Sequence, residues 1–416
     1  MRCSRRNPIL GNALAGRAQC ADKTPDTMLY YFDFSQYLRM LRLAWNEPNP
    51  MARRYFLFIL CVNVPLISCF HAICFFLDGI LFPALHKVEI RTPVFVVGHA
   101  RSGTTLVHRL MGMDEGRFSS FNLYELYFPS LLQKKLIRAV ARFDGRYLAG
   151  ALENRVRAWE EKRYASTRDI HAMGLTKPEE DDIVFYYSCA SGYWMTKLPY
   201  MGELDFYRID ERPAHERKRM MDFYKACIRR QLMLNGTDRV HLSKNPVFAG
   251  RVETLIEAFP DARIVVPMRN PNETIPSLLK LMRVGYRALD WDEDGIKRSL
   301  RFLADQSYHT YRYPLEVLAR HPEIRQSVID YRDVTARPAE TIERVYEQLG
   351  FSISDEYREV LRAEDKRART HETTHSYSLD EFGLAADEIR VELAPLFERF
   401  GWDDDLDASE SLGDGP

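Results

Sequence analysis

The sequence has almost no net charge. Its 416 residues include 58 lysines and arginines against 59 aspartates and glutamates, which gives a formal net charge of -1 at pH 7. A strong overall field for nucleic acid is therefore absent, and no nucleic-acid partner is expected. A local basic site for a small anion is still compatible with this balance, because a net charge hides local clusters.

Cysteine is scarce and irregularly spaced. The chain has seven cysteines, an odd number, and no two of them form a C-x-x-C motif. We therefore expect neither a disulfide framework nor a zinc site, and no cluster of metal ligands is visible. A reducing compartment is the simplest interpretation. Residues 1–33 also lack the apolar stretch of a cleavable secretory signal.

A lysine is missing from a motif that otherwise binds phosphate. Residues 98–105 read GHARSGTT, which matches the pattern G-x-x-x-x-G-K-[ST] at Gly98, Gly103 and Thr105 but has Thr104 in place of the lysine. In nucleotide triphosphatases that lysine neutralises the β- and γ-phosphates. A loop without it is expected to bind a smaller anion that carries less charge.

The residues around this turn place it between a strand and a helix. The β-rich run 91–97 precedes it and the helical pattern LVHRLMGM follows it. Backbone N–H groups of residues 101–105 would then surround an anion at a helix N-terminus. Arg101 would add a cation, and the hydroxyls of Ser102, Thr104 and Thr105 would add hydrogen-bond donors.

Further strand signals alternate with helical stretches along the rest of the chain. Strands are expected at 240–242, 263–268 and 327–331, and helices at 217–234, 251–258, 341–349 and 388–400. This alternation predicts an α/β protein of P-loop-like, three-layer fold, in which helices flank a central, mostly parallel sheet. The acidic end, residues 403–416, is expected to be disordered.

The N-terminal region contains one long apolar run. From Tyr55 to Leu77 the sequence has no Asp, Glu, Lys or Arg, and Arg53 and Arg54 precede it as at a cytoplasmic membrane boundary. Pro65 predicts either a kink or a helical hairpin that enters the membrane and returns. The alternative is a buried core helix. We therefore expect an apolar helical segment at 55–88, preceded by a polar and helical segment at 1–54.

The glycine turn resembles the 5′-phosphosulfate loop of the sulfotransferase superfamily, in which a basic residue precedes Ser-Gly-Thr-Thr. The family also has an arginine at a strand end and a serine eight residues later, and Arg269 and Ser277 have this spacing. The resemblance implies a sulfotransferase domain at 89–402, similar to bacterial-type members, that uses 3′-phosphoadenosine 5′-phosphosulfate without a metal. Arg101, Ser102, Gly103, Thr104 and Thr105 would bind the 5′-phosphosulfate, and Arg269 with Ser277 the 3′-phosphate.

Candidates for the chemistry are fewer and less specific. Lys244, in HLSKNP, is expected to place a cation at the transferring group, although Asn245 departs from the Lys-Ser/Thr-Pro turn of the family. Glu179, Glu180 and His171 are candidates for the general base, in that order. Acidic runs such as PEEDD are usually solvated, so each glutamate is as readily a surface residue.

The preferred function is sulfonate transfer to a hydroxyl or amine of a small, hydrophobic or lipid acceptor at a membrane. The alternatives are a P-loop kinase that uses ATP or GTP, and a membrane scaffold without enzyme activity. A hairpin would leave the catalytic domain in the cytoplasm, where the donor is supplied. A single span would place it in the Golgi lumen, as in the Golgi sulfotransferases.

Overall fold

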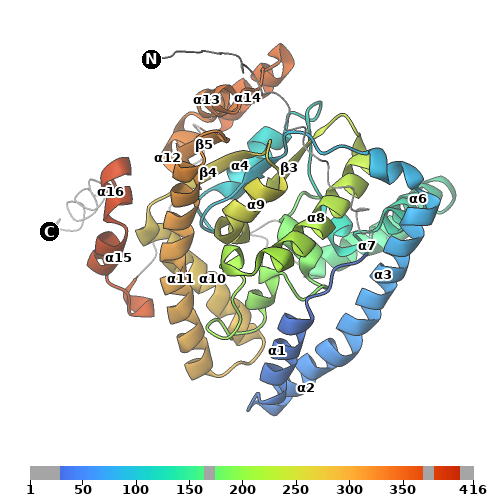
Figure 1. Ribbon diagram of the computed structural model, residues 1–416, viewed down its shortest axis with the longest axis horizontal. Coiled ribbons are helices and arrows are strands. Elements are labelled where there is room, and N and C mark those ends of the chain that lie inside the picture. Colours follow the sequence, from blue (N-terminus) through green and yellow to red (C-terminus); the bar gives the residue numbers. More distant parts are fainter. Residues whose placement is uncertain (1–28, 164–173, 369–378, 403–416) are drawn as a thin grey trace, which may run out of the picture.

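A parallel β-sheet of five strands lies at the centre of the computed structural model, which describes residues 29–163, 174–368 and 379–402 (Figure 1). The lateral order is β2-β3-β1-β4-β5, so β1 is the central strand. The strands are β1 (Val94–Val96), β2 (Phe118–Ser119), β3 (Val240–Lys244), β4 (Arg263–Met268) and β5 (Arg325–Asp330). All four neighbouring pairs are parallel. The α/β prediction is confirmed.

Alternate residues of the central strand point to two different hydrophobic clusters. Val94 and Val96 pack with one set of helices, whereas Phe95 packs with the other, as the period of two in a strand requires. The first face is covered by α4 (Thr104–Gly112), α12 (Tyr331–Ala336), α13 (Pro338–Leu349) and α14 (Asp355–Ala368). The second is covered by α8 (Ala214–Asn235), α9 (Val252–Ala258), α10 (Pro271–Ala288) and α11 (Glu293–Arg320). The protein therefore has the predicted three layers.

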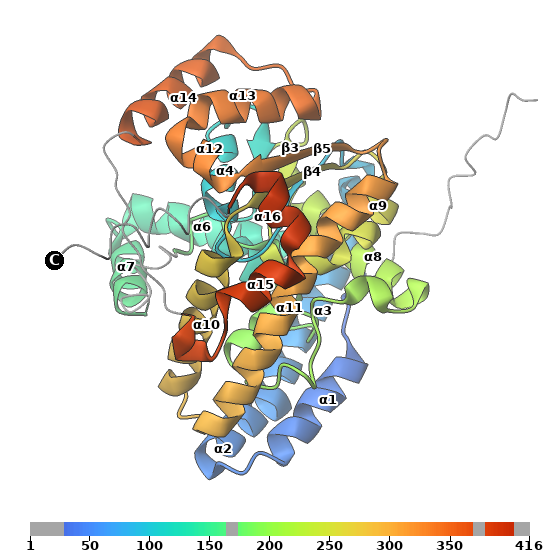
Figure 2. The same cartoon turned by 90° about the vertical axis from the view of Figure 1, so that its left-hand side faces the viewer.

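Two expectations about the elements were inexact. Strand β2 was not predicted, because two residues are too short to show a periodicity. The expected final helix at 388–400 is divided into α15 (Ala386–Glu392) and α16 (Ala394–Phe400), with Leu393 outside the helical region between them. Figure 2 shows both helices lying along α11, where Arg301 pairs with Glu388 at 2.8 Å.

The apolar run forms one continuous helix. It comprises α2 (Pro50–Phe58), a π-helical turn η1 (Ile59–Asn63) and α3 (Val64–Leu81). Proline has no N–H to donate to the preceding turn, and the π-helical turn just before Pro65 accommodates this loss without ending the helix. Of the two readings of Pro65, the hairpin is therefore wrong, and a locally distorted helix is what forms.

This helix is long and apolar enough to cross a membrane. The helix runs from Pro50 to Leu81, and its most apolar stretch of 18 residues has a mean hydropathy of 2.2. Together with α1 (Phe34–Trp45) it shares a hydrophobic cluster with the sheet, through Met40, Phe56 and Leu60. The helix begins at Pro50, inside the segment 1–54 that was expected to precede the apolar region.

Further helices lie in the part of the chain that the structure describes. They are α5 (Leu123–Tyr127), α6 (Leu131–Tyr147) and α7 (Ala151–Arg163), with short 3-10 turns η2 (Pro83–Lys87), η4 (Asp181–Phe185), η5 (Gly192–Thr196), η6 (Ile209–Glu211), η7 (Pro246–Arg251) and η8 (Asp380–Phe382). Helix α6 packs beside α3. In both ribbon views α13 and α14 lie at the top of the molecule, whereas α1 and α2 lie at the bottom. Residues 1–28 and the acidic tail 403–416 lie outside the described residues.

Candidate active site

The predicted site residues follow the carboxyl ends of neighbouring parallel strands. The glycine turn follows β1, Lys244 is the last residue of β3, and Arg269 comes directly after β4. Tyr331 follows β5 in the same way. Because the strands are parallel, these ends meet at one edge of the sheet. The central place of β1 puts the turn between Lys244 on one side and Arg269 on the other.

The turn itself has an unusual backbone. Gly103 has a φ of +93°, and Arg101, which is not a glycine, has a φ of +71°. A Cβ atom at Gly103 would lie 2.5 Å from Cδ2 of Tyr331, so only glycine fits there. An arginine in the left-handed region costs about 1–3 kcal/mol and is found where a function requires the conformation. The strain therefore supports a binding role for this turn.

Ser102 stabilises the glycine turn through hydrogen bonds within the loop. Its hydroxyl donates to the carbonyl of His99 at 2.6 Å, and its backbone N–H donates to the same carbonyl at 3.2 Å. Both donors are thus used inside the loop, and the role of Ser102 in binding the donor nucleotide stays a prediction. Helix α4 begins at Thr104, so the N–H groups of Thr104 and Thr105 belong to a first turn that has no intrahelical acceptors for them.

The two predicted phosphate sites are in contact. The Nε of Arg101 donates to Oγ of Ser277 at 3.1 Å, although the two residues are 176 positions apart in the sequence. The guanidinium carbon of Arg269 lies 4.4 Å from the centre of the Tyr331 ring, the same ring that abuts Gly103. One aromatic ring therefore separates Arg269 from the glycine turn.

Arg269 is held by an acidic neighbour on α10. Its Nε donates to Oε2 of Glu273 at 2.9 Å, and its Nη2 donates to the same oxygen. The Arg269 side chain is 24% exposed and the Glu273 side chain 43%, so the pair is open to water and to a ligand. A phosphate at this place would meet an arginine that is already oriented but partly neutralised.

Lys244 forms a buried cluster with both predicted glutamates. Its Nζ lies 3.4 Å from Oε1 of Glu180 and 3.7 Å from Oε1 of Glu179, and it donates to Oγ1 of Thr105 at 3.5 Å. Burial alone would lower the pKa of Lys244, but the carboxylates of Glu180 and Glu179 outweigh it and raise that pKa above the usual value. Lys244 is therefore a cation that contacts the first turn of α4.

The acidic run that contains these glutamates is mostly buried. Glu179 is 2% exposed, and Asp181 and Asp182 are fully buried. Asp181 accepts a hydrogen bond from the hydroxyl of Tyr224 at 2.5 Å and lies 2.8 Å from Nε2 of His241. The alternative of a solvated acidic face, which the sequence left open, is thus excluded for Glu179, and Asp181 and Asp182 are buried with it, because buried partners compensate the carboxylates.

Asp182 connects the acidic run to η5 and η7 through side-chain contacts. It accepts from the hydroxyl of Ser191 at 2.6 Å and pairs with the buried Arg251 at 3.1 Å. Burial raises the pKa of Asp182, although Arg251 acts in the opposite direction. Asp181 and Asp182 are positioned to hold the backbone that presents Glu179 and Glu180 to Lys244.

A buried histidine near the cluster was not predicted. His108 lies on α4 one turn after Thr105, and its Nε2 is 3.0 Å from the Ser120 hydroxyl. Burial, with a smaller effect of Lys244, lowers the pKa of His108 to about 4, so the ring is neutral at pH 7. Its spacing of three from Thr105 was the available sequence signal. His171, the third candidate base, lies outside the described residues.

Comparison with known proteins identifies the family. A model of the sulfotransferase family matches residues 93–355, which is more than half of the chain and contains the glycine turn, Lys244, Arg269 and Ser277. The chain is 25% identical over 333 residues to the omega-hydroxy-beta-dihydromenaquinone-9 sulfotransferases of Mycobacterium bovis and Mycobacterium tuberculosis, and the match covers 75% of this chain and 75% of each relative.

Solved structures show the same fold. The sulfotransferase STF1 from Mycobacterium tuberculosis superposes with a TM-score of 0.64 at 18% identity, over 87% of this chain and 92% of that one. The sulfotransferase STF9 from Mycobacterium avium superposes with a TM-score of 0.65 at 19% identity, over 89% and 93%. The strand order, the strained turn and the matching family model lead to one conclusion: the chain belongs to the sulfotransferase family, is similar to bacterial-type members of it, and is an enzyme.

Proposed function

We propose that the chain transfers a sulfonate from 3′-phosphoadenosine 5′-phosphosulfate to the hydroxyl of a hydrophobic or lipid acceptor. The hydrogen bond between Arg101 and Ser277 is the observation that carries this proposal, because it joins a loop suited to one phosphate to a helix suited to another. A nucleotide with phosphate groups on both its 3′ and 5′ positions matches such a site.

Each half of the site has the chemistry for one anionic group. The first turn of α4 and the Arg101 guanidinium would hold the 5′-phosphosulfate. Arg269 would bind the 3′-phosphate through charge-assisted hydrogen bonds, and Ser277 would add a neutral donor. The Tyr331 ring would keep Arg269 at a fixed distance from the turn.

The Lys244 cluster would carry the group transfer. The acceptor oxygen attacks the sulfur in line, the bond from sulfur to the phosphate oxygen breaks, and adenosine 3′,5′-bisphosphate leaves. Lys244 would stabilise the charge that grows on the leaving oxygen. The acceptor proton would pass to a carboxylate, and we favour Glu180 over Glu179 because its side chain is 19% exposed rather than 3%. We propose no metal in this reaction.

The acceptor class rests on a relative and on the apolar helix. The curated relatives act on a menaquinone-derived lipid. The long helix α2–α3 would bring the enzyme to a membrane, where a lipid hydroxyl is concentrated. An amine acceptor is the alternative.

We propose that the catalytic domain faces the cytoplasm, where the donor is supplied. Membership of the sulfotransferase family argues against the kinase and scaffold alternatives.

Calorimetry with adenosine 3′,5′-bisphosphate would test the donor site. We expect binding by the intact chain, weaker or absent binding of ATP, and a loss of about 10- to 100-fold in affinity for Arg269→Ala, because hydrogen bonds to charged groups contribute about 1.5–3 kcal/mol each. Arg287→Ala is a matched control, since Arg287 lies on α10, the helix that follows Arg269, and pairs with Glu293 at the surface. Equal affinity of Arg269→Ala and the unaltered protein would contradict the proposal. Radiolabelled donor with a lipid extract would then identify the acceptor.

A further inference from the structure

Within α3, the second half of the long apolar helix, the side chains of Ser68, His71 and Asp78 point to the inside. Ser68 donates its hydroxyl to the carbonyl of Tyr187 at 2.6 Å, and Nδ1 of His71 lies 2.9 Å from the side-chain nitrogen of Gln133. Asp78 is fully buried. The opposite face of the same helix exposes large apolar side chains, such as Leu66, which is 70% exposed. This polarity is the reverse of that of a helix on the surface of a water-soluble protein.

Asp78 couples this helix rigidly to α6. Its carboxylate accepts from the backbone N–H groups of Leu131 and Leu132 at 2.9 and 2.8 Å, which lie in the first turn of α6. It also pairs with the buried Arg230 at 2.7 Å, and Arg230 belongs to α8 of the catalytic domain. A buried pair that loses one partner is costly, so α3 stays on the protein.

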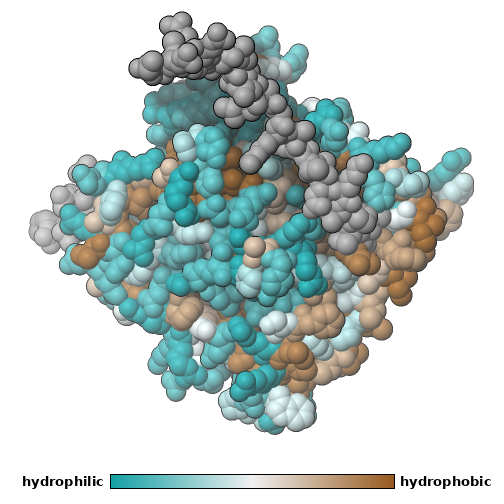
Figure 3. Space-filling model, viewed as in Figure 1, coloured by the Kyte–Doolittle hydropathy of each residue, from teal (hydrophilic) through white to brown (hydrophobic). Residues whose placement is uncertain are grey.

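Helix α6 continues the exposed apolar surface. Leu136, Val140, Phe143 and Tyr147 are 62%, 47%, 54% and 62% exposed and follow one another at spacings of four, three and four residues, which places them on one stripe. Figure 3 shows hydrophobic residues along the edge of the molecule where Figure 1 places α3 and α6. We call the exposed apolar side chains of α1, α2–α3 and α6 the apolar face.

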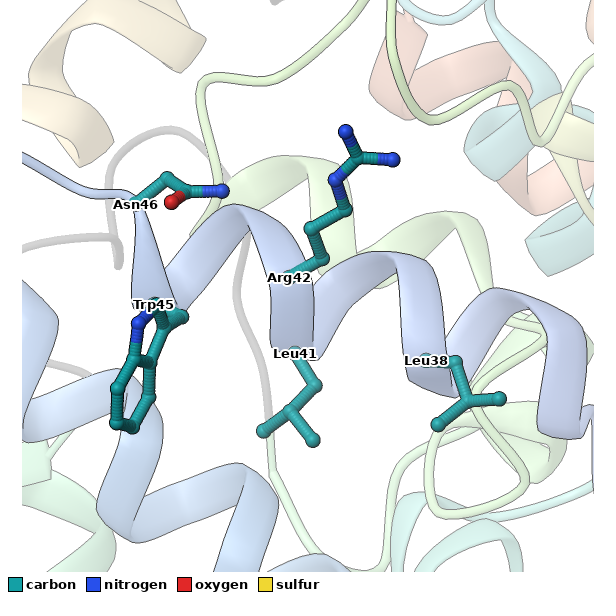
Figure 4. A pocket seen from close by; sticks show the side chains of 5 residues that line it. All are labelled: Leu38, Leu41, Arg42, Trp45 and Asn46. Carbon is teal, nitrogen blue, oxygen red and sulfur yellow. The ribbon is translucent and has the colours of Figure 1, made fainter.

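Helix α1 adds a shallow pocket to the apolar face. The pocket has a volume of about 330 Å³ and is lined by Leu38, Leu41, Arg42, Trp45 and Asn46. In Figure 4 the leucines and Trp45 project to one side of α1, whereas Arg42 projects to the other. Trp45 is 69% exposed. A helix with a tryptophan on its apolar side and a basic side chain on its other side is typical of a membrane–water boundary.

The exposed charged side chains of the segments that form the apolar face have one sign. Within residues 34–81 and 131–147 the three acidic residues, Glu47, Asp78 and Asp144, are all buried. The exposed ionised side chains of these two segments are all basic, among them Arg42, Arg53, Arg54, Lys135, Arg142 and Arg146. The whole chain, in contrast, has a net charge of -1. Basic side chains beside an apolar stripe match the anionic headgroups of a bilayer.

We propose that the apolar face lies in one leaflet of an anionic membrane, with α2–α3 parallel to the surface and not across it. A span would take the buried Asp78–Arg230 pair and part of α6 into hydrocarbon. The 32-residue helix measures about 48 Å at 1.5 Å per residue, which exceeds the roughly 30 Å of the hydrocarbon core. A second copy on this face would bring its basic side chains against their own like charges. Only the purpose of this membrane binding, which is access to a lipid acceptor, rests on the proposed function.

Flotation of the full chain with vesicles tests this face. We expect binding to vesicles of phosphatidylcholine with phosphatidylglycerol, weaker binding to phosphatidylcholine alone, and about tenfold weaker binding for each of Leu66→Glu and Phe143→Glu. Val391→Glu is the matched control, because Val391 is 76% exposed on the distant helix α15 and should leave binding unchanged. Equal vesicle binding by all three variants would overturn the proposal, as would a dimer in solution that Leu66→Glu dissociates.

Depth measurements separate the interface from a span. Quenching of Trp45, obtained by difference from Trp45→Phe, should be stronger with bromines near the glycerol end of the lipid than at the end of the acyl chain. Release of the protein by alkaline carbonate is expected, and retention as an integral protein would overturn the proposal. Calorimetry with adenosine 3′,5′-bisphosphate on the same variants should give unchanged affinity. A loss of donor binding without a loss of vesicle binding would refute the proposed function and leave the membrane face intact.

Discussion

Replacement of Lys244 separates a catalytic role from a structural one. The ammonium group is buried between two carboxylates, at 3.4 Å from Glu180 and 3.7 Å from Glu179. The variant Lys244→Met keeps the length of the side chain and removes the charge. It leaves the buried carboxylate of Glu179 without this cation, so both stability and activity should change.

The distances from Lys244 to the two glutamates give the expected size of these changes. With an effective dielectric constant of about 20, Coulomb's law gives attractions of roughly 5 and 4.5 kcal/mol for the two contacts. Desolvation of the three groups offsets much of this, and the free energy of unfolding is expected to fall by about 3–5 kcal/mol, as for other broken buried pairs. The loss of a cation at the leaving oxygen should lower kcat by about 100- to 1000-fold.

The double variant Glu179→Gln with Lys244→Met decides between the two roles. It removes the buried charge of Glu179 together with the charge of Lys244, so denaturant unfolding should show most of the lost stability restored, whereas kcat in the radiolabelled-donor assay should stay low. Recovery of kcat together with stability would refute the catalytic role of Lys244. Lys280→Met is the control, because Lys280 is exposed on α10 and should change the unfolding free energy by no more than about 0.5 kcal/mol.

Three further predictions follow from individual contacts in the site. Glu273→Gln should tighten binding of adenosine 3′,5′-bisphosphate several-fold in calorimetry, because the carboxylate that competes for the arginine and repels the 3′-phosphate is removed; unchanged or weaker binding would count against the assignment. Gly103→Ala should abolish that binding, since its Cβ would collide with Tyr331, whereas Gly145→Ala, which has nothing within 4 Å, should bind normally. His108 is neutral when folded and titrates near pH 6.5 when unfolded, so its contribution to stability is present above pH 6.5 and is lost as the pH falls towards about 4. The free energy of unfolding, measured with denaturant, should therefore fall from pH 7.5 to pH 5.5. We expect this fall to be about 1.4 kcal/mol smaller in His108→Gln than in the unaltered protein. Equal falls in the two proteins would contradict the burial of a neutral ring.

Local patterns carried the prediction of the donor site. The glycine turn is bounded by a strand and a helix, and the eight-residue spacing from Arg269 to Ser277 lies within one strand end and one helix. Such features depend on neighbours in the sequence, so they can be recognised there. The start of α10 at Pro271 is also a local feature, because proline is favoured in a first helical turn.

Burial, in contrast, could not be predicted from local patterns. The acidic run 179–182 has the composition of a solvated face, yet His241, Tyr224 and Arg251 approach it from other parts of the chain and compensate its carboxylates. The hairpin at Pro65 was an equally local reading, and packing of the helix along the catalytic domain excludes it. No window of sequence around these residues contains the partners that decide their environment.

The sequence by itself determined the class of fold, the glycine turn, the spacing of Arg269 and Ser277 and the apolar run, because each is encoded by residues a few positions apart. Only the tertiary structure decided that β1 lies between β3 and β4, and with it that Lys244, the turn and Arg269 converge. It also decided that Asp78 faces inward, so that the apolar side of its helix is left uncovered. The physical reason is that the order of the strands and the orientation of the helices minimise the exposed apolar surface and the uncompensated charge of the whole chain. No single segment of the sequence contains this total.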